Sequence, residues 1–169
     1  MPAPLIQAAF DHHVWATVRL LDTCSALEAS QLESGVPGTY GSVLETLRHV
    51  VQGDADYLAM LRRESVAPVD TSDMGLAELK ATMESNGAGW THFLRGDLDA
   101  GAVVRDVDED GYQRDAPVGI RLAQALHHGN DHRSQVCTGL TALGIEPPYV
   151  SAWRFGLETG QVIDTPPAS

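Results

Sequence analysis

The stretch VGIRLAQALHHGNDHRSQVCTGLTALG, residues 118–144, decides the fold class of this chain. Its apolar side chains recur at spacings close to three and four residues, which is the period of an amphipathic α-helix. Gly144 suits the left-handed conformation that ends many helices, and Pro147–Pro148 prevents any continuation. The stretch therefore predicts one long helix that begins after Pro117. Its apolar side consists of Ile120, Leu122, Leu126, Val136, Leu140 and Leu143.

A first helix is predicted near the start of the chain. Apolar residues from Ile6 to Leu27 keep the same helical spacing. The run SGVPG at residues 34–38 is a turn signal, so this helix is expected to end between Ala29 and Leu32.

A second helix is predicted to begin after Thr39 or Ser42. Ser42 can cap it, because Glu45 lies three residues later and completes a capping box. The helix has to stop before Pro68. Its apolar positions include Val43, Leu47, Val50, Leu58 and Leu61.

A third helix is predicted to begin after residues 71–73 and to run through Leu94. Gly87 and Gly89 each weaken a helix by roughly 1 kcal/mol relative to alanine, so a kink or break is expected near residues 87–89. The apolar positions of this helix are Leu76, Leu79, Met83, Trp90 and Leu94.

The segment between the third and the last helix has no helical period. It reads DLDAGAVVRDVDEDGYQRDAPV, residues 97–118, and DEDG at 108–111 is a turn signal between two short extended candidates. The segment therefore predicts a loop or a weak two-stranded hairpin. At the other end of the chain, residues 148–158 predict a short docking helix.

Four amphipathic helices in a chain of 169 residues favour an all-α fold, namely a four-helix bundle. This length suits one domain, so residues 1–169 are expected to form a single unit. The long connection between the third and fourth helices allows a non-sequential topology.

Composition and charge exclude several kinds of partner. Eleven basic residues against 23 acidic ones give a net charge of −12, which repels nucleic acid and anionic membrane surfaces. No apolar run approaches the roughly 20 residues that cross a bilayer, and the first residues lack the pattern of a secretory signal. Cys24 and Cys137 are isolated, which fits a reducing compartment. The sequence thus predicts a cytoplasmic protein that acts on a small molecule.

Three histidines lie within the quoted stretch. His128 and His132 are one helical turn apart, about 6 Å along the axis, and two imidazoles at this spacing can chelate one divalent ion. Such pairs also arise by chance on helix surfaces. This pair adjoins the apolar side of its helix, however, and burying two histidines without partners is costly. His127 points about 100° away and is expected to lie outside any such site.

A third ligand would have to come from another helix, and His49 is the best candidate. It lies in the middle of the second predicted helix, beside the apolar face. Gly53, one turn further on, is expected to leave space beside this imidazole. The alternative is that His49 is a hydrogen-bonded core or boundary histidine without a metal.

Three segments of the chain resemble the DinB/YfiT-like superfamily. They are FDHHVWATVRLLD (10–22), TYGSVLETLRHVVQGDADYL (39–58) and ALHHGNDHRSQVCTGLTALGIEPPY (125–149), and they follow the family's order over nearly the whole chain. The family has a glycine after its His-Arg pair where this chain has Ser134. Because serine is also small, close helix packing is expected to survive.

The resemblance implies a four-helix bundle of DinB/YfiT type. It also implies that His49, His128 and His132 form a metal triad for zinc, nickel or a similar divalent ion. Several members of the superfamily look like metal-dependent thiol S-transferases or isomerases that use bacillithiol or mycothiol. A stress-response S-transferase acting on a small electrophile, and a homodimer, are therefore implied for this chain.

The residues themselves leave other functions open. Three histidine ligands leave an open position on a metal, which could activate either water or a thiol. A metal-dependent hydrolase of a small ester or amide and a non-enzymatic, metal-stabilised binding protein are the alternatives. His13, Asp54 and Asp56 are candidate general acids or bases, although a solvated or capping role is favoured for each. Arg133 is expected to pair with a carboxylate or a helix end, and Cys137 to be a small buried hydrophobe.

Overall fold

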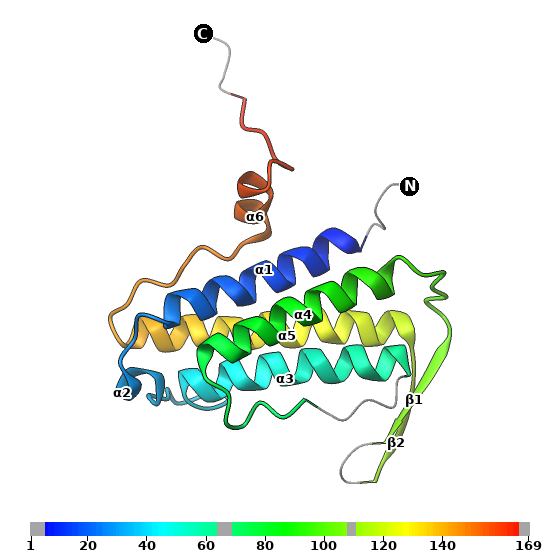
Figure 1. The fold of residues 1–169 in the computed structure, drawn as a ribbon, viewed down its shortest axis with the longest axis horizontal. Coiled ribbons are helices and arrows are strands. Elements are labelled where there is room, and N and C mark those ends of the chain that lie inside the picture. The colour runs from blue at the N-terminus through cyan, green and yellow to red at the C-terminus, as the bar shows by residue number, and fades with distance from the viewer. Residues whose placement is uncertain (1–5, 64–68, 108–110, 166–169) are drawn as a thin grey trace.

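The computed structural model describes residues 6–63, 69–107 and 111–165. Within these ranges, four long helices run alongside one another (Figure 1). They are α1 (Gln7–Cys24), α3 (Val43–Arg62), α4 (Leu76–Leu94) and α5 (Val118–Ala142). The smaller elements are α2 (Ala29–Leu32), β1 (Val103–Val107), β2 (Gln113–Pro117) and α6 (Ala152–Glu158). The predicted all-α bundle is confirmed. No helix in the described part of the chain combines the length and the apolar character that a membrane span requires.

The four long helices do not pack in the order of the chain. α1 packs against α4 and α5, and α3 packs against the same two helices. α1 and α3 therefore lie at opposite corners of the bundle, as the predicted non-sequential topology allows. The hairpin of β1 and β2 joins α4 to α5 at one end of the bundle (Figure 1).

The start of α3 follows the predicted capping box. Ser42 Oγ accepts a hydrogen bond from the backbone N–H of Glu45, and Glu45 Oε2 accepts one from the backbone N–H of Ser42. At the far end of α5, Gly144 adopts a φ of 74°, the left-handed conformation expected just past the helix.

The predicted end of the first helix was wrong. α1 stops at Cys24 and a separate short helix, α2, occupies Ala29–Leu32. Two local hydrogen bonds explain the break. Ser25 Oγ donates to the backbone carbonyl of Asp22 at 2.6 Å, and the backbone N–H of Glu28 donates to the side chain of Gln31 at 2.9 Å. Side chains that bond the nearby backbone in this way compete with continued helix.

Of the kink or break predicted in the third helix, the break was wrong, since α4 is continuous from Leu76 to Leu94. A Cβ added at Gly87 would stand 2.9 Å from Val14 Cγ1, and one at Gly89 would stand 2.5 Å from Leu58 Cδ2. The two glycines thus let α1 and α3 approach α4 closely. This packing offsets the low intrinsic helix propensity of glycine.

The sequence predicted either a loop or a weak two-stranded hairpin for residues 97–118, and the structure shows the hairpin. β1 and β2 pair antiparallel from Val103 opposite Pro117 to Val107 opposite Gln113. Val104 is buried and joins the core of the bundle. Residues 108–110 of the predicted turn lie outside the described residues, while Gly111 has a φ of 81°, which suits a turn.

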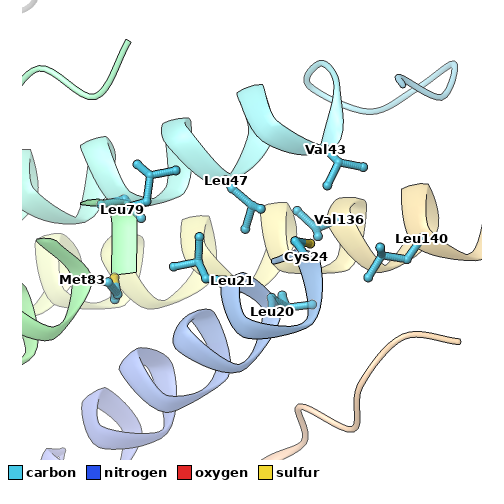
Figure 2. Packing of buried hydrophobic residues seen from close by; sticks show 10 residues of the cluster. Leu20, Leu21, Cys24, Val43, Leu47, Leu79, Met83, Val136 and Leu140 are labelled. Atoms are coloured by element: carbon cyan, nitrogen blue, oxygen red, sulfur yellow. The ribbon is translucent and has the colours of Figure 1, made fainter. Parts of the chain in front are cut away.

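The apolar core consists of two clusters at different levels of the bundle. Figure 2 shows the first, in which side chains from α1, α3, α4 and α5 interdigitate. It contains Leu20, Leu21, Cys24, Val43, Leu47, Val51, Leu79, Met83, Val136 and Leu140. The second contains Phe10, Leu58, Leu61, Trp90, Leu94, Val104, Val118, Leu122 and Ala125. Along α1, α3 and α5, the residues between the two clusters include buried polar side chains.

These polar side chains form one chain of hydrogen bonds across all four long helices. The Nε2–H of His13 donates to Oδ1 of Asp54 at 2.8 Å, and the indole N–H of Trp90 donates to the same oxygen at 2.9 Å. Arg133 NH1 donates to His13 Nδ1 at 2.9 Å. An arginine can only donate, so His13 is neutral and carries its proton on Nε2. Exposure is 1% for His13, 2% for Asp54 and 4% for Arg133.

Removal of the Asp54 carboxylate is expected to destabilise the bundle strongly. Asp54→Ala leaves the buried N–H groups of His13 and Trp90 without an acceptor, and each buried donor left unsatisfied costs about 1–3 kcal/mol. Chemical denaturation at pH 7 measures the free energy of unfolding. Asp56→Ala is the matched control, because Asp56 lies on the same helix but is exposed, and its loss should change stability by about 0.5 kcal/mol or less. A loss below about 1 kcal/mol for Asp54→Ala would show that the network does not stabilise the bundle.

Candidate metal centre

Three histidines from two helices converge on one point. His49 comes from α3, and His128 and His132 come from α5. One ring nitrogen of each lies within 4.8 Å of the others, and all three side chains are half-buried. Nε2 of His49 and Nε2 of His128 are 2.9 Å apart. The structure thus brings together the three residues that the sequence singled out.

Gly53 creates the space for this convergence, but for a different ring from the one predicted. A Cβ at Gly53 would stand 2.6 Å from Cε1 of His128, closer than real Cβ atoms approach a neighbour. The missing side chain therefore makes room for His128 from across the interface rather than for His49 on its own helix. Any larger residue at this position would push the His128 ring away from its partners.

A glutamine fixes the orientation of His132. Gln135 Oε1 accepts a hydrogen bond from the backbone N–H of Tyr40 at 2.7 Å and lies 3.3 Å from His132 Nδ1. An amide oxygen can only accept, so Nδ1 of His132 carries the proton and its Nε2 keeps a lone pair. A hydrogen bond of this kind on the far nitrogen is a common way of orienting a metal-binding histidine.

Two tyrosines flank the histidines. The Tyr40 ring stacks on His49 at 4.0 Å between centroids with 12° between planes, and meets His132 edge-on at 5.4 Å. The Tyr57 ring packs edge-on against His128 at 5.7 Å. Tyr57 lies about two helical turns after His49, so the helical period alone places it on the same side of α3. Tyr40 lies in the loop before α3, and nothing in the sequence indicated its contact with a helix some 95 residues away.

The environment keeps the imidazoles of His49 and His128 neutral. Burial and the neighbouring His132 lower the pKa of His49. Burial, followed by the nearby His132 and His49, lowers the pKa of His128 to about 4. At neutral pH both rings are therefore unprotonated, which is the form that binds metals.

An open pocket adjoins the triad on the His49 side. It has a volume of about 630 Å³ and lies between the loop before α3, the α3 helix and residues 70–72. Tyr40 and His49 both line it, together with Glu45, Arg48 and Gln52. A small molecule in this pocket would be next to His49.

The other candidates from the sequence lie elsewhere. His13 and Asp54 are buried in the hydrogen-bond network, so the solvated or capping role favoured for them was wrong. Asp56 is exposed and accepts from Gln52, in agreement with its expected surface role. His127 is exposed and, as expected, is not part of the triad.

Two further side chains of α5 were predicted to have structural roles. Arg133 binds His13 and the hydroxyl of Thr17 rather than a carboxylate or a helix end, so that prediction was wrong. Cys137 is half-buried and packs against the first apolar cluster, as expected.

The donor set fits a divalent metal ion. Three neutral imidazoles are suitable ligands for zinc, nickel and similar ions. Two nitrogens bound to one tetrahedral ion stand about 3.3 Å apart, so the 2.9 Å between His49 and His128 requires only a small adjustment.

Comparison with known families settles the relationship of the chain. The family model named DinB family matches residues 1–159. The chain belongs to the DinB family. Comparison with curated proteins gave no match. The DinB-family bundle thus carries a three-histidine cluster that could hold a metal ion between α3 and α5.

Acid is expected to destabilise the metal-free DinB-family protein through His128. Its pKa is near 6.5 in the unfolded chain and about 4 in the folded one, so between these values only the unfolded chain binds the proton. The free energy of unfolding should therefore fall as the pH drops from 6.5 towards 4. Denaturation of chelator-treated protein at several pH values measures the slope. His128→Gln should show a shallower fall, and parallel profiles for the two proteins would contradict the assignment.

Proposed function

We propose that this DinB-family protein is a metal-dependent enzyme that transfers a low-molecular-weight thiol to a small electrophilic substrate. The observation that carries the proposal is the cluster of three imidazoles, of which His49 borders an open pocket of about 630 Å³. Three protein ligands and an accessible side are the layout of a catalytic metal site rather than a closed structural one.

His49, His128 and His132 would hold the divalent ion, with zinc or nickel as the favoured metals. Such an ion supplies positive charge that lowers the pKa of a thiol placed against it, so that the reactive thiolate is present at neutral pH. Hydrogen bonding by Gln135 holds His132 in the tautomer that the site requires. Gly53 keeps His128 in reach of its partners.

The pocket supports a polar thiol as the co-substrate. Glu45 and Arg48 contribute charges of both signs to its lining. The Nε–H of Arg48 donates to the backbone carbonyl of Met74 at 3.0 Å, and the side chain of Gln52 accepts from the backbone N–H of Thr71 at 3.1 Å. These bonds fix the polar wall, which suits a hydroxyl-rich thiol such as bacillithiol or mycothiol.

The proposed reaction is a substitution or addition at carbon. The sulfur of the thiol forms a bond to the electrophilic carbon of the substrate. In a substitution, the leaving group departs with its bonding electron pair, and the proton of the thiol passes to water in the pocket. In an addition, the π bond at the attacked carbon breaks, its electron pair moves away from that carbon, and the atom that receives the pair takes up a proton from water. Tyr40, stacked on His49, would screen one side of the site from solvent. A role in the stress response follows from this chemistry, because small electrophiles are toxic.

Three expectations from the sequence accompany this proposal. A homodimer, a cytoplasmic location and the absence of a nucleic-acid or membrane partner remain predictions. Solution scattering or analytical ultracentrifugation would determine the oligomeric state.

Metal content is the first test of the triad. Purified protein is expected to contain close to one equivalent of a divalent ion, measured by elemental analysis. His49→Ala should lose at least nine-tenths of it, because two histidines from one helix remain. His127→Ala is the matched control, since His127 is exposed on the same helix as the other two ligands and should leave the metal content unchanged. Full occupancy in His49→Ala would contradict the proposed triad.

The dependence of turnover on a thiol is the second test. With a chromogenic alkylating electrophile as substrate, the rate above background should require added bacillithiol, mycothiol or cysteine. His132→Ala should reduce that rate at least 100-fold. Turnover of a small ester or amide in thiol-free buffer would instead assign a hydrolase. Loss of both metal and fold in His132→Ala, with no turnover by the native protein, would indicate a structural metal.

A further inference from the structure

A second pocket lies on a different side of α5 from the histidine triad. It has a volume of about 580 Å³ and is enclosed by α1, α5, α6 and the residues that follow α6. This volume falls in the range of about 300–1,000 Å³ that is typical of small-molecule sites. The triad faces α3, whereas this pocket faces α1, so the two sites share a helix but not an opening.

The wall formed by α6 is held firmly in place. His12 on α1 donates from Nε2 to the backbone carbonyl of Val150 at 2.8 Å, and its ring meets Phe155 of α6 edge-on at 5.9 Å. Glu158, at the end of α6, forms ion pairs with Arg19 of α1 at 2.8 Å and with Arg154 at 2.6 Å. The pocket is thus bounded by packed and paired side chains.

The lining combines apolar side chains with one charged group, the guanidinium of Arg133. Most of it is apolar, and Leu126, Phe155 and Val162 are its larger members. Its titratable residues are three histidines and Arg133, and none of the described lining residues is acidic. In a chain with 23 acidic residues and only 11 basic ones, this local composition favours an anion.

The guanidinium group of Arg133 has one edge on which it can bind such an anion. Within the described residues, its hydrogen bonds all leave from NH1, towards Nδ1 and the carbonyl of His13 and the hydroxyl of Thr17. The opposite edge, made of Nε and NH2, is the one that grips a carboxylate with two parallel bonds. Arg105 uses this edge in the same molecule, with Nε and NH2 bonded to the two oxygens of Asp115 at 2.7 and 2.6 Å.

We propose that this pocket binds a small molecule with a carboxylate on a compact apolar body. The Nε–NH2 edge of Arg133 receives the carboxylate, and Phe155 and Val162 contact the apolar part. NH1 holds the guanidinium in place through His13, so the edge is positioned before the ligand arrives. Asn130, at the rim of the pocket, offers a further amide donor. The site is separate from the triad and does not require a metal.

Paired neutral and charged probes test the proposal. Isothermal titration of the native protein with benzoate and with benzamide compares two ligands of nearly the same shape. Benzoate is expected to bind at least ten-fold more tightly than benzamide, because only the carboxylate can accept both bonds from Arg133. Ala9→Trp fills the pocket from α1 and should weaken benzoate binding at least ten-fold. Ala81→Trp, on an exposed position of α4, is the matched control and should leave the affinity unchanged.

The same titration separates this site from the triad, because a carboxylate could also bind a metal there. Benzoate affinity should stay within two-fold in His49→Ala and after treatment with a chelator. Arg133→Lys keeps the charge but loses the two-bond edge, and should weaken binding about ten-fold. If that variant does not fold, Ala9→Trp still decides the question. Absence of benzoate binding, equal affinity for benzamide, unchanged affinity in Ala9→Trp, or loss of binding with the metal would each overturn the proposal.

Discussion

The buried carboxylate of Asp54 is the constraint on which the rest of the bundle depends. A charge at 2% exposure needs donors, and these come from His13 and Trp90, while His13 in turn needs Arg133. The four partners lie on four different helices, so sliding any helix by one residue breaks a bond that water cannot replace. Apolar clusters above and below tolerate small shifts, but this layer does not. It therefore fixes the register that brings the triad histidines together.

Local patterns in the sequence predicted what is local in the structure. The spacing of apolar residues predicted the four long helices, and Ser42 with Glu45 predicted the start of α3. The four-residue step between His128 and His132 predicted a shared face of one helix. The position of His49 beside the apolar face of the second predicted helix made it the candidate third ligand, and the family resemblance implied the same triad. The end of α1 could not be predicted, because the apolar spacing continues past Cys24. The helix ends there through local side-chain hydrogen bonds, which this spacing does not reveal.

Contacts between distant segments account for the rest of what the sequence did not reveal. His13 and Asp54 are 41 residues apart, and Arg133 lies 120 residues from His13. The sequence favoured a solvated or capping role for His13 and Asp54 and a carboxylate or helix-end partner for Arg133, because the burial of all three depends on the other helices. The structure also explains why a serine is tolerated at position 134, where the family has a glycine. Ser134 is exposed and bonds the carbonyl of Asn130 on its own helix, so no neighbouring helix has to accommodate it.

The close contact between Gly53 and the ring of His128 means that positions 53 and 128 are expected to change together during evolution. A mutation that gives position 53 a side chain collides with the ring at position 128, and it becomes neutral only once that histidine has been lost or moved. The two sites should therefore change together or not at all among descendants of this protein. We expect descendants with a glycine at position 53 to retain the histidine at position 128. Descendants with a bulky residue at position 53 are expected to have lost the three-histidine cluster.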